Sequence, residues 1–208
     1  MRVGIVDYGA GNLASVANTV CAAGGDPILA RTPEEVLSAD RLILPGVGAA
    51  GAAMENLRAR GLDGALRHAV RDKARPMLGI CLGMQLIARR LYEFGEHEGL
   101  GLIEGEVRSL SEVPQAGPRI PHMGWNAVTP LEAAAPFLDR VKGRREFYFC
   151  HSYTLLGCPD TCIAARTEHG ASLVAAVRDG TVFATQFHPE KSQINGQRLI
   201  EAFLGWTP

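Results

Sequence analysis

Short apolar runs alternate with longer amphipathic stretches through the first half of this chain, and the alternation limits the folds open to it. The runs have the length and β-branched content of strands, whereas the stretches between them place apolar residues at helical spacing. Such alternation is typical of a parallel sheet with helices on both faces. The predicted strands are residues 2–7, 27–30, 41–44 and 77–80, and the predicted helices are 13–23, 52–60, 62–73 and 82–91. We therefore expect an α/β fold with a single doubly wound, mostly parallel sheet.

The second half of the chain has a different pattern, in which strand-like runs follow one another with turn residues between them. Asp179-Gly180 is a hairpin turn signal, because both residues tolerate a positive φ. The predicted strands are 102–110, 126–129, 146–153, 162–168, 172–178 and 181–187, before a helix over 193–204. We expect added antiparallel hairpin strands. Without a repeat or linker, residues 1–208 are predicted to form one domain.

Charge and composition exclude several classes of function. Twenty-one Lys and Arg residues face 22 Asp and Glu, so the net charge is -1 and no overall basic field would attract nucleic acid or an anionic membrane. The longest runs without charge, such as 42–54, are shorter than the roughly 20 apolar residues that cross a bilayer. The start of the chain does not resemble a secretory leader, and five scattered cysteines fit reduced thiols. We expect a cytoplasmic protein.

Cys81 lies where a predicted strand turns into a predicted helix, with Gly79 and Gly83 two residues away on either side. This is the pattern of a nucleophile elbow with sulfur in place of oxygen. Small neighbours let the strand and the helix approach closely, and the start of a helix favours a thiolate. The next amide, on Leu82, can point at a developing oxyanion. The alternative is that Cys81 is only a small buried apolar residue.

A nucleophilic cysteine needs a base, and His188-Pro189-Glu190 follows a predicted strand. Pro189 favours an extended His188, so the side chains of His188 and Glu190 can project to similar sides. Glu190 could then orient the imidazole and stabilise its cation. The alternative is a strand-end histidine beside a surface carboxylate. Together with the elbow, the pair favours a Cys81, His188, Glu190 triad.

Two glycine-rich segments favour a competing hypothesis, a dinucleotide-binding or regulatory module without catalysis. Residues 46–51 match G-x-G-x-x-G, and residues 9–14 match its alanine-ended variant. The acidic ribose ligand expected about 20 residues later is missing, because residues 29–32 read Leu-Ala-Arg-Thr. After Gly46 the corresponding stretch, residues 65–68, lies in a predicted helix and not at a strand end. The context of both segments therefore disagrees with dinucleotide binding.

A zinc hypothesis rests on Cys158 and Cys162, with His151 and His169 near them in sequence. Three residues separate the two cysteines, and no second cysteine pair exists. We expect no metal. Cys150 and His151 are neighbours in a predicted strand and should point to opposite faces, so direct activation of one by the other is not expected.

With these motifs together, the chain resembles the class I, triad-type glutamine amidotransferases and, among them, the family of glutaminase subunits of imidazole glycerol phosphate synthase. The resemblance extends over nearly the whole sequence. The segments that carry it are 79–85, 188–190, 7–12, 45–48, 121–126, 147–153 and 186–192.

The resemblance implies that Cys81 attacks the side-chain amide of L-glutamine and that His188 protonates the departing ammonia. Water then hydrolyses a glutamyl thioester, with His188 as base and Glu190 orienting it. The resemblance implies no cofactor. It also implies a set of residues that bind the substrate or its oxyanion, and these are Val47, Gly48, Leu82, Gln85, His151 and Ser152.

The resemblance further implies a partner, the TIM-barrel cyclase subunit of the same synthase, in a heterodimer. The barrel would use the ammonia to make imidazole glycerol phosphate and aminoimidazole carboxamide ribotide in histidine biosynthesis. The residues implied at this interface and along the ammonia passage are Asn12, Met123, Trp125, Tyr148 and Lys191. Another triad amidotransferase subunit and a stand-alone γ-glutamyl hydrolase are the alternatives within this chemistry.

Overall fold

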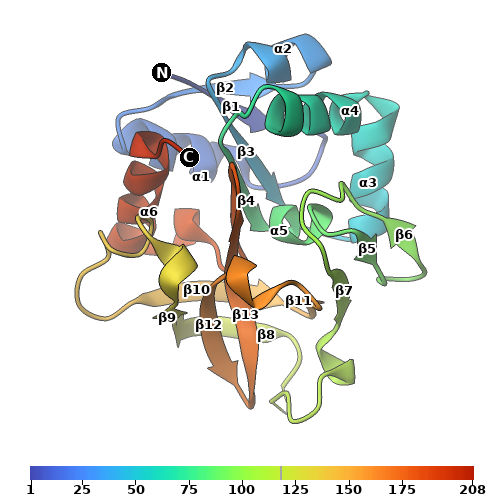
Figure 1. Cartoon of the computed structure of the whole chain (residues 1–208), viewed down its shortest axis with the longest axis vertical. Coiled ribbons are helices and arrows are strands. Elements are labelled where there is room, and N and C mark those ends of the chain that lie inside the picture. Colours follow the sequence, from blue (N-terminus) through green and yellow to red (C-terminus); the bar gives the residue numbers. More distant parts are fainter. Residues whose placement is uncertain (118) are drawn as a thin grey trace.

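A mixed sheet of eight strands forms the centre of the molecule (Figure 1). The computed structural model describes residues 1–117 and 119–208. The first five strands of the sheet pair in parallel and the remaining three pair antiparallel. In order across the sheet they are β2 (Asp26–Ala30), β1 (Arg2–Val6), β3 (Arg41–Gly46), β4 (Met77–Cys81), β14 (Val182–Thr185), β13 (Ala171–Asp179), β12 (Ile163–His169) and β9 (Thr129–Pro130).

Helices cover both faces of the parallel part of the sheet, because its strands carry apolar residues on both sides. In β3, Leu42 and Leu44 belong to one buried cluster and Ile43 to the other. The face of Ile43 is covered by α1 (Leu13–Ala22) and α6 (Gln193–Gly205). The opposite face is covered by α2 (Pro33–Ser38), α3 (Ala50–Ala59), α4 (Leu62–Arg67), the π-helical η1 (His68–Asp72) and α5 (Leu82–Leu86).

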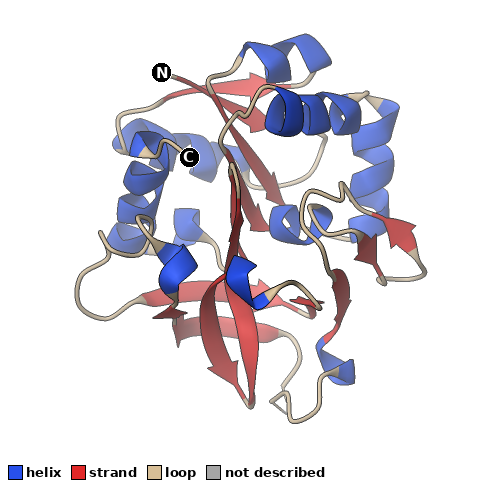
Figure 2. Ribbon diagram, in the orientation of Figure 1, coloured by secondary structure: helices blue, strands red, loops and turns tan. Residues whose placement is uncertain are grey.

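Two smaller sheets accompany the central one, and Figure 2 shows mostly strands in the lower part of the molecule. One pairs β10 (Glu146–His151) with β8 (His122–Ala127). The other has the order β11 (Tyr153–Leu156), β7 (Glu106–Ser109), β5 (Arg90–Leu91) and β6 (His97–Glu98). Short 3-10 turns complete the described chain: η2 (Leu110–Glu112), η3 (Glu132–Ala134), η4 (Asp160–Cys162) and η5 (Pro189–Lys191).

The predicted fold class is confirmed: the sheet is mostly parallel, has helices on both faces, and gains antiparallel strands from the second half of the chain. The hairpin between β13 and β14 turns where Asp179-Gly180 predicts it, since Asp179 pairs with Val182 and Gly180 has a φ of 51°.

Four predicted elements are wrong in their extent. The strands predicted over 126–129 and 146–153 each span parts of two strands in different sheets, β8 with β9 and β10 with β11. The other two are a helix and a strand. The helix predicted over 82–91 ends at Leu86, because the backbone of the following segment pairs with β6 and β7 instead of continuing the helix. The strand predicted over 102–110 is limited to Glu106–Ser109, since Gly101 and Gly105 before it have φ values of 61° and 126°. These last two errors fall where apolar periodicity alone cannot distinguish a short helix from strand and turn.

The carboxyl ends of β3, β4 and β14 lie side by side, because these three strands are parallel neighbours. The chain segments that follow them therefore meet at one edge of the sheet, which is where open α/β sheets place their sites. Of the helices in the described ranges, none combines the length and the hydrophobicity that crossing a bilayer requires.

Candidate active site

Cys81 lies at the sharp turn between β4 and α5, with φ 52° and ψ -106°. Such a conformation costs a residue with a side chain about 1–3 kcal/mol. The structure gives the flanking glycines a steric reason. A Cβ on Gly83 would overlap the backbone carbonyl of Leu44, and one on Gly79 would lie 3.1 Å from the Gly83 carbonyl carbon. The elbow therefore requires a glycine at position 83, whereas a side chain at position 79 would require its neighbours to shift by a few tenths of an ångström.

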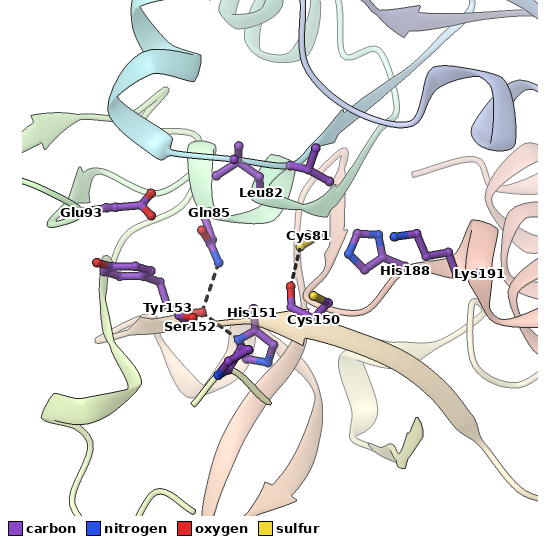
Figure 3. Close-up of a pocket in the computed structure, with 13 residues that line it drawn as sticks. Cys81, Leu82, Gln85, Glu93, Cys150, His151, Ser152, Tyr153, His188 and Lys191 are labelled. Carbon is purple, nitrogen blue, oxygen red and sulfur yellow. Dashed lines mark hydrogen bonds between the residues drawn. The ribbon is translucent and has the colours of Figure 1, made fainter. Parts of the chain in front are cut away.

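The structure brings His188 beside Cys81 (Figure 3). The Nδ1 of His188 lies 2.8 Å from Oε1 of Glu190, and both side chains are almost fully buried. His188 is extended, with φ -100° and ψ 97°, as Pro189 predicts. Its amide donates to the carbonyl of Tyr148 over 2.9 Å. The carboxylate therefore orients the ring at Nδ1 and the backbone bond holds the residue in place, with Nε2 left to face the cysteine.

The pKa of His188 is the net result of opposing effects. Burial of the ring lowers it, but hydrogen bonds with Cys81 and Glu190 outweigh burial and raise the pKa to about 9. The raised pKa favours the protonated imidazole at neutral pH, between the sulfur and the carboxylate. A protonated imidazole beside a nucleophile can supply the proton that a leaving group needs.

The end of β3 lies beside the elbow, where Gly46 leaves room for the buried Tyr8 side chain. Gly46 pairs with Cys81 in the sheet, and a Cβ on Gly46 would overlap the Tyr8 hydroxyl. That hydroxyl donates to the carbonyl of Pro45 over 2.9 Å, and burial raises the pKa of Tyr8 well above its usual range. The segment that follows, with Gly48 at a φ of 100°, thus begins at a fixed position beside the nucleophile.

A cavity of about 300 Å³ opens in front of Cys81. Gln85 lies in its wall and donates from Nε2 to the carbonyl of Tyr153 over 3.1 Å (Figure 3). The same nitrogen donates to Oε1 of Gln186 over 3.2 Å. The Nε2 of Gln186 lies 3.8 Å from the Cys81 sulfur. All six residues predicted to bind substrate or oxyanion line this cavity: Val47, Gly48, Leu82, Gln85, His151 and Ser152.

The sequence reasoning did not single out Glu93, Tyr153, Cys150 or Gln186 as site residues. Glu93 lines the cavity and accepts from the amide of Ala50, at the start of α3, over 2.6 Å. A helix over 82–91, as predicted, would carry the chain away from Cys81, so the sequence pattern does not place Glu93 at the cavity. The carbonyl of Cys150 lies 3.8 Å from the sulfur, a backbone contact that no side-chain pattern reports.

Four of the five residues predicted at a partner surface gather near His188. Met123 and Trp125 project outward from β8, with 60% and 49% of their surface exposed. Trp125 packs edge-on against Tyr148, with 6.4 Å between ring centroids, and the Lys191 ammonium lies 5.7 Å from the centroid of Tyr148.

Asn12, the fifth, is exposed at the start of α1, where its side chain accepts from the amide of Ser15. The loop before it lies against the end of β3, since a Cβ on Gly11 would lie 3.6 Å from the Gly46 Cα. Among the described residues, no group of three His, Cys, Asp or Glu side chains is arranged to hold a metal ion.

Comparison with known proteins finds relatives that match nearly the whole length of the chain. The family model of the class I glutamine amidotransferases matches residues 4–205. The imidazole glycerol phosphate synthase subunit HisH of Zymomonas mobilis is 43% identical over 99% of this chain and 96% of its own length. The HisH subunit of Aquifex aeolicus is 41% identical over 98% of this chain and 96% of its own length.

Solved structures share the fold at low sequence identity. A crystal structure of a glutamine amidotransferase superposes with a TM-score of 0.76 at 22% identity, covering 97% of this chain and 96% of that one. PurLQS from Thermotoga maritima gives a TM-score of 0.75 at 16% identity, covering 98% of this chain and 97% of the other.

Proposed function

Because the chain belongs to the class I glutamine amidotransferase family and, within it, to the HisH subunits of imidazole glycerol phosphate synthase, we propose that Cys81, His188 and Glu190 are its catalytic triad. The chain is thus a glutaminase subunit in histidine biosynthesis. The observation that carries the residue assignment is the strained Cys81 elbow facing a buried His188–Glu190 pair.

The geometry supports a two-step reaction. The Cys81 sulfur attacks the carboxamide carbon of glutamine, the C–N bond breaks, and His188 gives its proton to the departing ammonia. A glutamyl thioester remains. His188 then takes a proton from water, which attacks the thioester carbon, and the thiolate leaves as glutamate is released. Glu190 keeps the imidazole oriented and stabilises its charged form throughout.

The oxyanion of each tetrahedral intermediate needs donors close to the sulfur. The Leu82 amide, the first after the nucleophile, is one donor, and the Val47–Gly48 segment at the cavity wall supplies the other. Tyr8 supports that segment through the Pro45 carbonyl. Preorganised amides of this kind stabilise charge that develops only during the reaction.

The cavity suits an amino acid with a long neutral side chain. Glu93 is the carboxylate in its lining and would pair with the substrate ammonium, at the end away from His188 (Figure 3). Gln85 and Ser152 would bind the rest of the substrate. The volume of about 300 Å³ lies at the lower end of the range of small-molecule sites.

For the partner, we propose a TIM-barrel cyclase subunit that docks over Met123, Trp125, Tyr148 and Lys191 in a heterodimer and receives ammonia there. Half-exposed aromatic and Met side chains beside a site are the residue types enriched at interfaces. Asn12 lies next to the β3 end and would border this surface. Residues 1–208 would act as one domain, in the cytoplasm, without nucleic acid or membrane.

The test is glutamate release by the chain mixed with its cyclase partner and the partner's nucleotide ligand. We expect release by the wild type and its loss in Cys81→Ala, whereas Cys21→Ala, which changes an exposed cysteine, should keep full activity. Full activity in Cys81→Ala would overturn the assignment. Unchanged release without any partner would favour a stand-alone hydrolase.

A further inference from the structure

A chain of hydrogen bonds links two buried histidines and a half-buried asparagine beside the cavity. The Nδ1 of His151 lies 2.8 Å from the carbonyl oxygen of Tyr153. The Nε2 of His151 lies 2.9 Å from Nδ1 of His122, and the Nε2 of His122 lies 3.1 Å from Nδ2 of Asn126. The chain runs from the cavity wall to β8, the strand that presents Met123 and Trp125.

The direction of every bond in this chain is determined by its two ends. A carbonyl can only accept, so His151 carries its proton on Nδ1 and accepts at Nε2. His122 must then donate from Nδ1 and accept at Nε2. The Asn126 amide fits this direction, because its Oδ1 accepts from the Ala127 amide and its Nδ2 also donates to the Glu168 carbonyl. Both histidines are therefore neutral and share one tautomer.

The surroundings favour the same protonation state. His122 stacks between Phe149 and His169, with centroid distances of 4.6 and 4.3 Å. Burial, together with the neighbouring histidines, lowers the pKa of His122 to about 4 and that of His151 to about 3, although the bond to Tyr153 acts in the opposite direction on His151. A proton added to either ring would place two N–H groups face to face and break the chain.

The chain ends on the segment that forms the floor of the proposed glutamine site. The Tyr153 carbonyl accepts from both His151 and Gln85, and the Cys150 carbonyl lies 3.8 Å from the nucleophilic sulfur. Residues 150–153 all line the cavity. The position of this backbone therefore depends, through His151, on His122 and Asn126, which do not line the cavity.

We propose that His122 and Asn126 are positioning residues, which hold His151 and thereby fix residues 150–153 in the conformation that receives glutamine. The inference rests on the proposed function. It assigns to two residues of β8 a role in substrate binding. In this role, the donor proton on His122 matters more than the ring itself.

Two variants of His122 distinguish the effect of losing the hydrogen-bond donor from the effect of losing the aromatic ring. Asparagine places an amide nitrogen at the position of Nδ1 and can still donate to His151, whereas leucine has nearly the same size and no donor. Both lose the stacking on Phe149 and His169 equally. In the complex with the cyclase, His122→Leu should raise the KM for glutamine about fivefold relative to His122→Asn, as loss of one buried hydrogen bond implies, with kcat changed less. Equal KM values in the two variants would overturn the proposal.

The tautomers of the two histidines can be measured directly, and a general loss of stability would not change them in the way that the proposal predicts. Long-range proton–nitrogen NMR spectra of the wild type should show His122 and His151 neutral, with the proton on Nδ1. In Asn126→Asp the donor to His122 Nε2 becomes an acceptor, so His122 should keep its proton on Nδ1, bind a second proton at Nε2 and show a raised pKa. A wild-type His122 protonated at Nε2 would contradict the proposal. Absence of glutaminase activity in the wild type would instead count against the proposed function.

Discussion

Replacing Gly83 with alanine tests the steric account of the elbow that holds Cys81. The added Cβ would overlap the Leu44 carbonyl, which belongs to the buried strand β3 and cannot move aside as a flexible side chain would. Overpacking a rigid site costs up to about 3 kcal/mol. Alanine in place of glycine within helix α5 returns about 1 kcal/mol. The net expectation is a loss of about 2 kcal/mol in the free energy of unfolding.

Gly64 provides the matched control. It also lies in a short helix, α4, but a Cβ there would meet no atom within 4 Å. Gly64→Ala should therefore show only the effect of the higher helix propensity of alanine and stabilise the protein by about 0.5–1 kcal/mol.

Thermal unfolding followed by circular dichroism measures both effects. For a chain of this length, a loss of about 2 kcal/mol lowers the Tm by about 4–8 °C, whereas Gly64→Ala should raise it by about 2 °C. Glutamate release by Gly83→Ala should also fall, because the Leu82 amide moves with the displaced helix. A Gly83→Ala protein as stable and as active as the wild type would refute the steric reasoning.

The other predictions concern the charge, support and partner of the site. Glu190→Gln should lower the pKa of His188 from about 9, visible by NMR titration, and reduce kcat/KM by about 10²-fold or more. The raised pKa of His188 stabilises the fold fully below pH 6.5, and this contribution is lost as the pH rises through about 9. The difference in unfolding free energy between Glu190→Gln and the wild type should therefore shrink above pH 9. A difference that stays constant with pH would contradict this. Tyr8→Phe removes the buried bond to Pro45 and should cost about 1 kcal/mol in urea unfolding, so an unchanged stability would be evidence against that support. Trp125→Ala should weaken cyclase binding about tenfold or more by calorimetry while the Tm of the isolated chain changes little; equal affinity would place the interface elsewhere.

Local chemistry made much of the site predictable from the sequence. The elbow follows from two glycines around Cys81, and the extended His188 follows from the proline after it. The convergence of both motifs follows from topology, because parallel neighbours β4 and β14 end at the same edge of the sheet. The six residues named from the family resemblance as binding the substrate or its oxyanion all line one cavity.

The unpredicted part of the site depends on backbone geometry and on contacts distant in sequence. Glu93 reaches the cavity only because α5 ends at Leu86 and the chain turns into β5, where apolar spacing continues to favour a helix. The link between His122 and His151 depends on the register of β8 and β10, in which the two residues are directly paired. A register of this kind is not encoded by either strand alone.

The central claim, that Cys81 forms a glutamyl thioester resolved with the help of His188, is tested most directly by trapping that intermediate. The complex with the cyclase would be mixed with glutamine, quenched in acid and digested, and the peptides would be analysed by mass spectrometry. A His188→Asn protein should form the glutamyl adduct on the peptide that contains Cys81 more slowly, because the proton donor of the first step is missing. It should then retain this adduct, because water is no longer activated for the second step. An adduct on another residue, or none on Cys81 in a complex that still releases glutamate, would contradict the proposed mechanism.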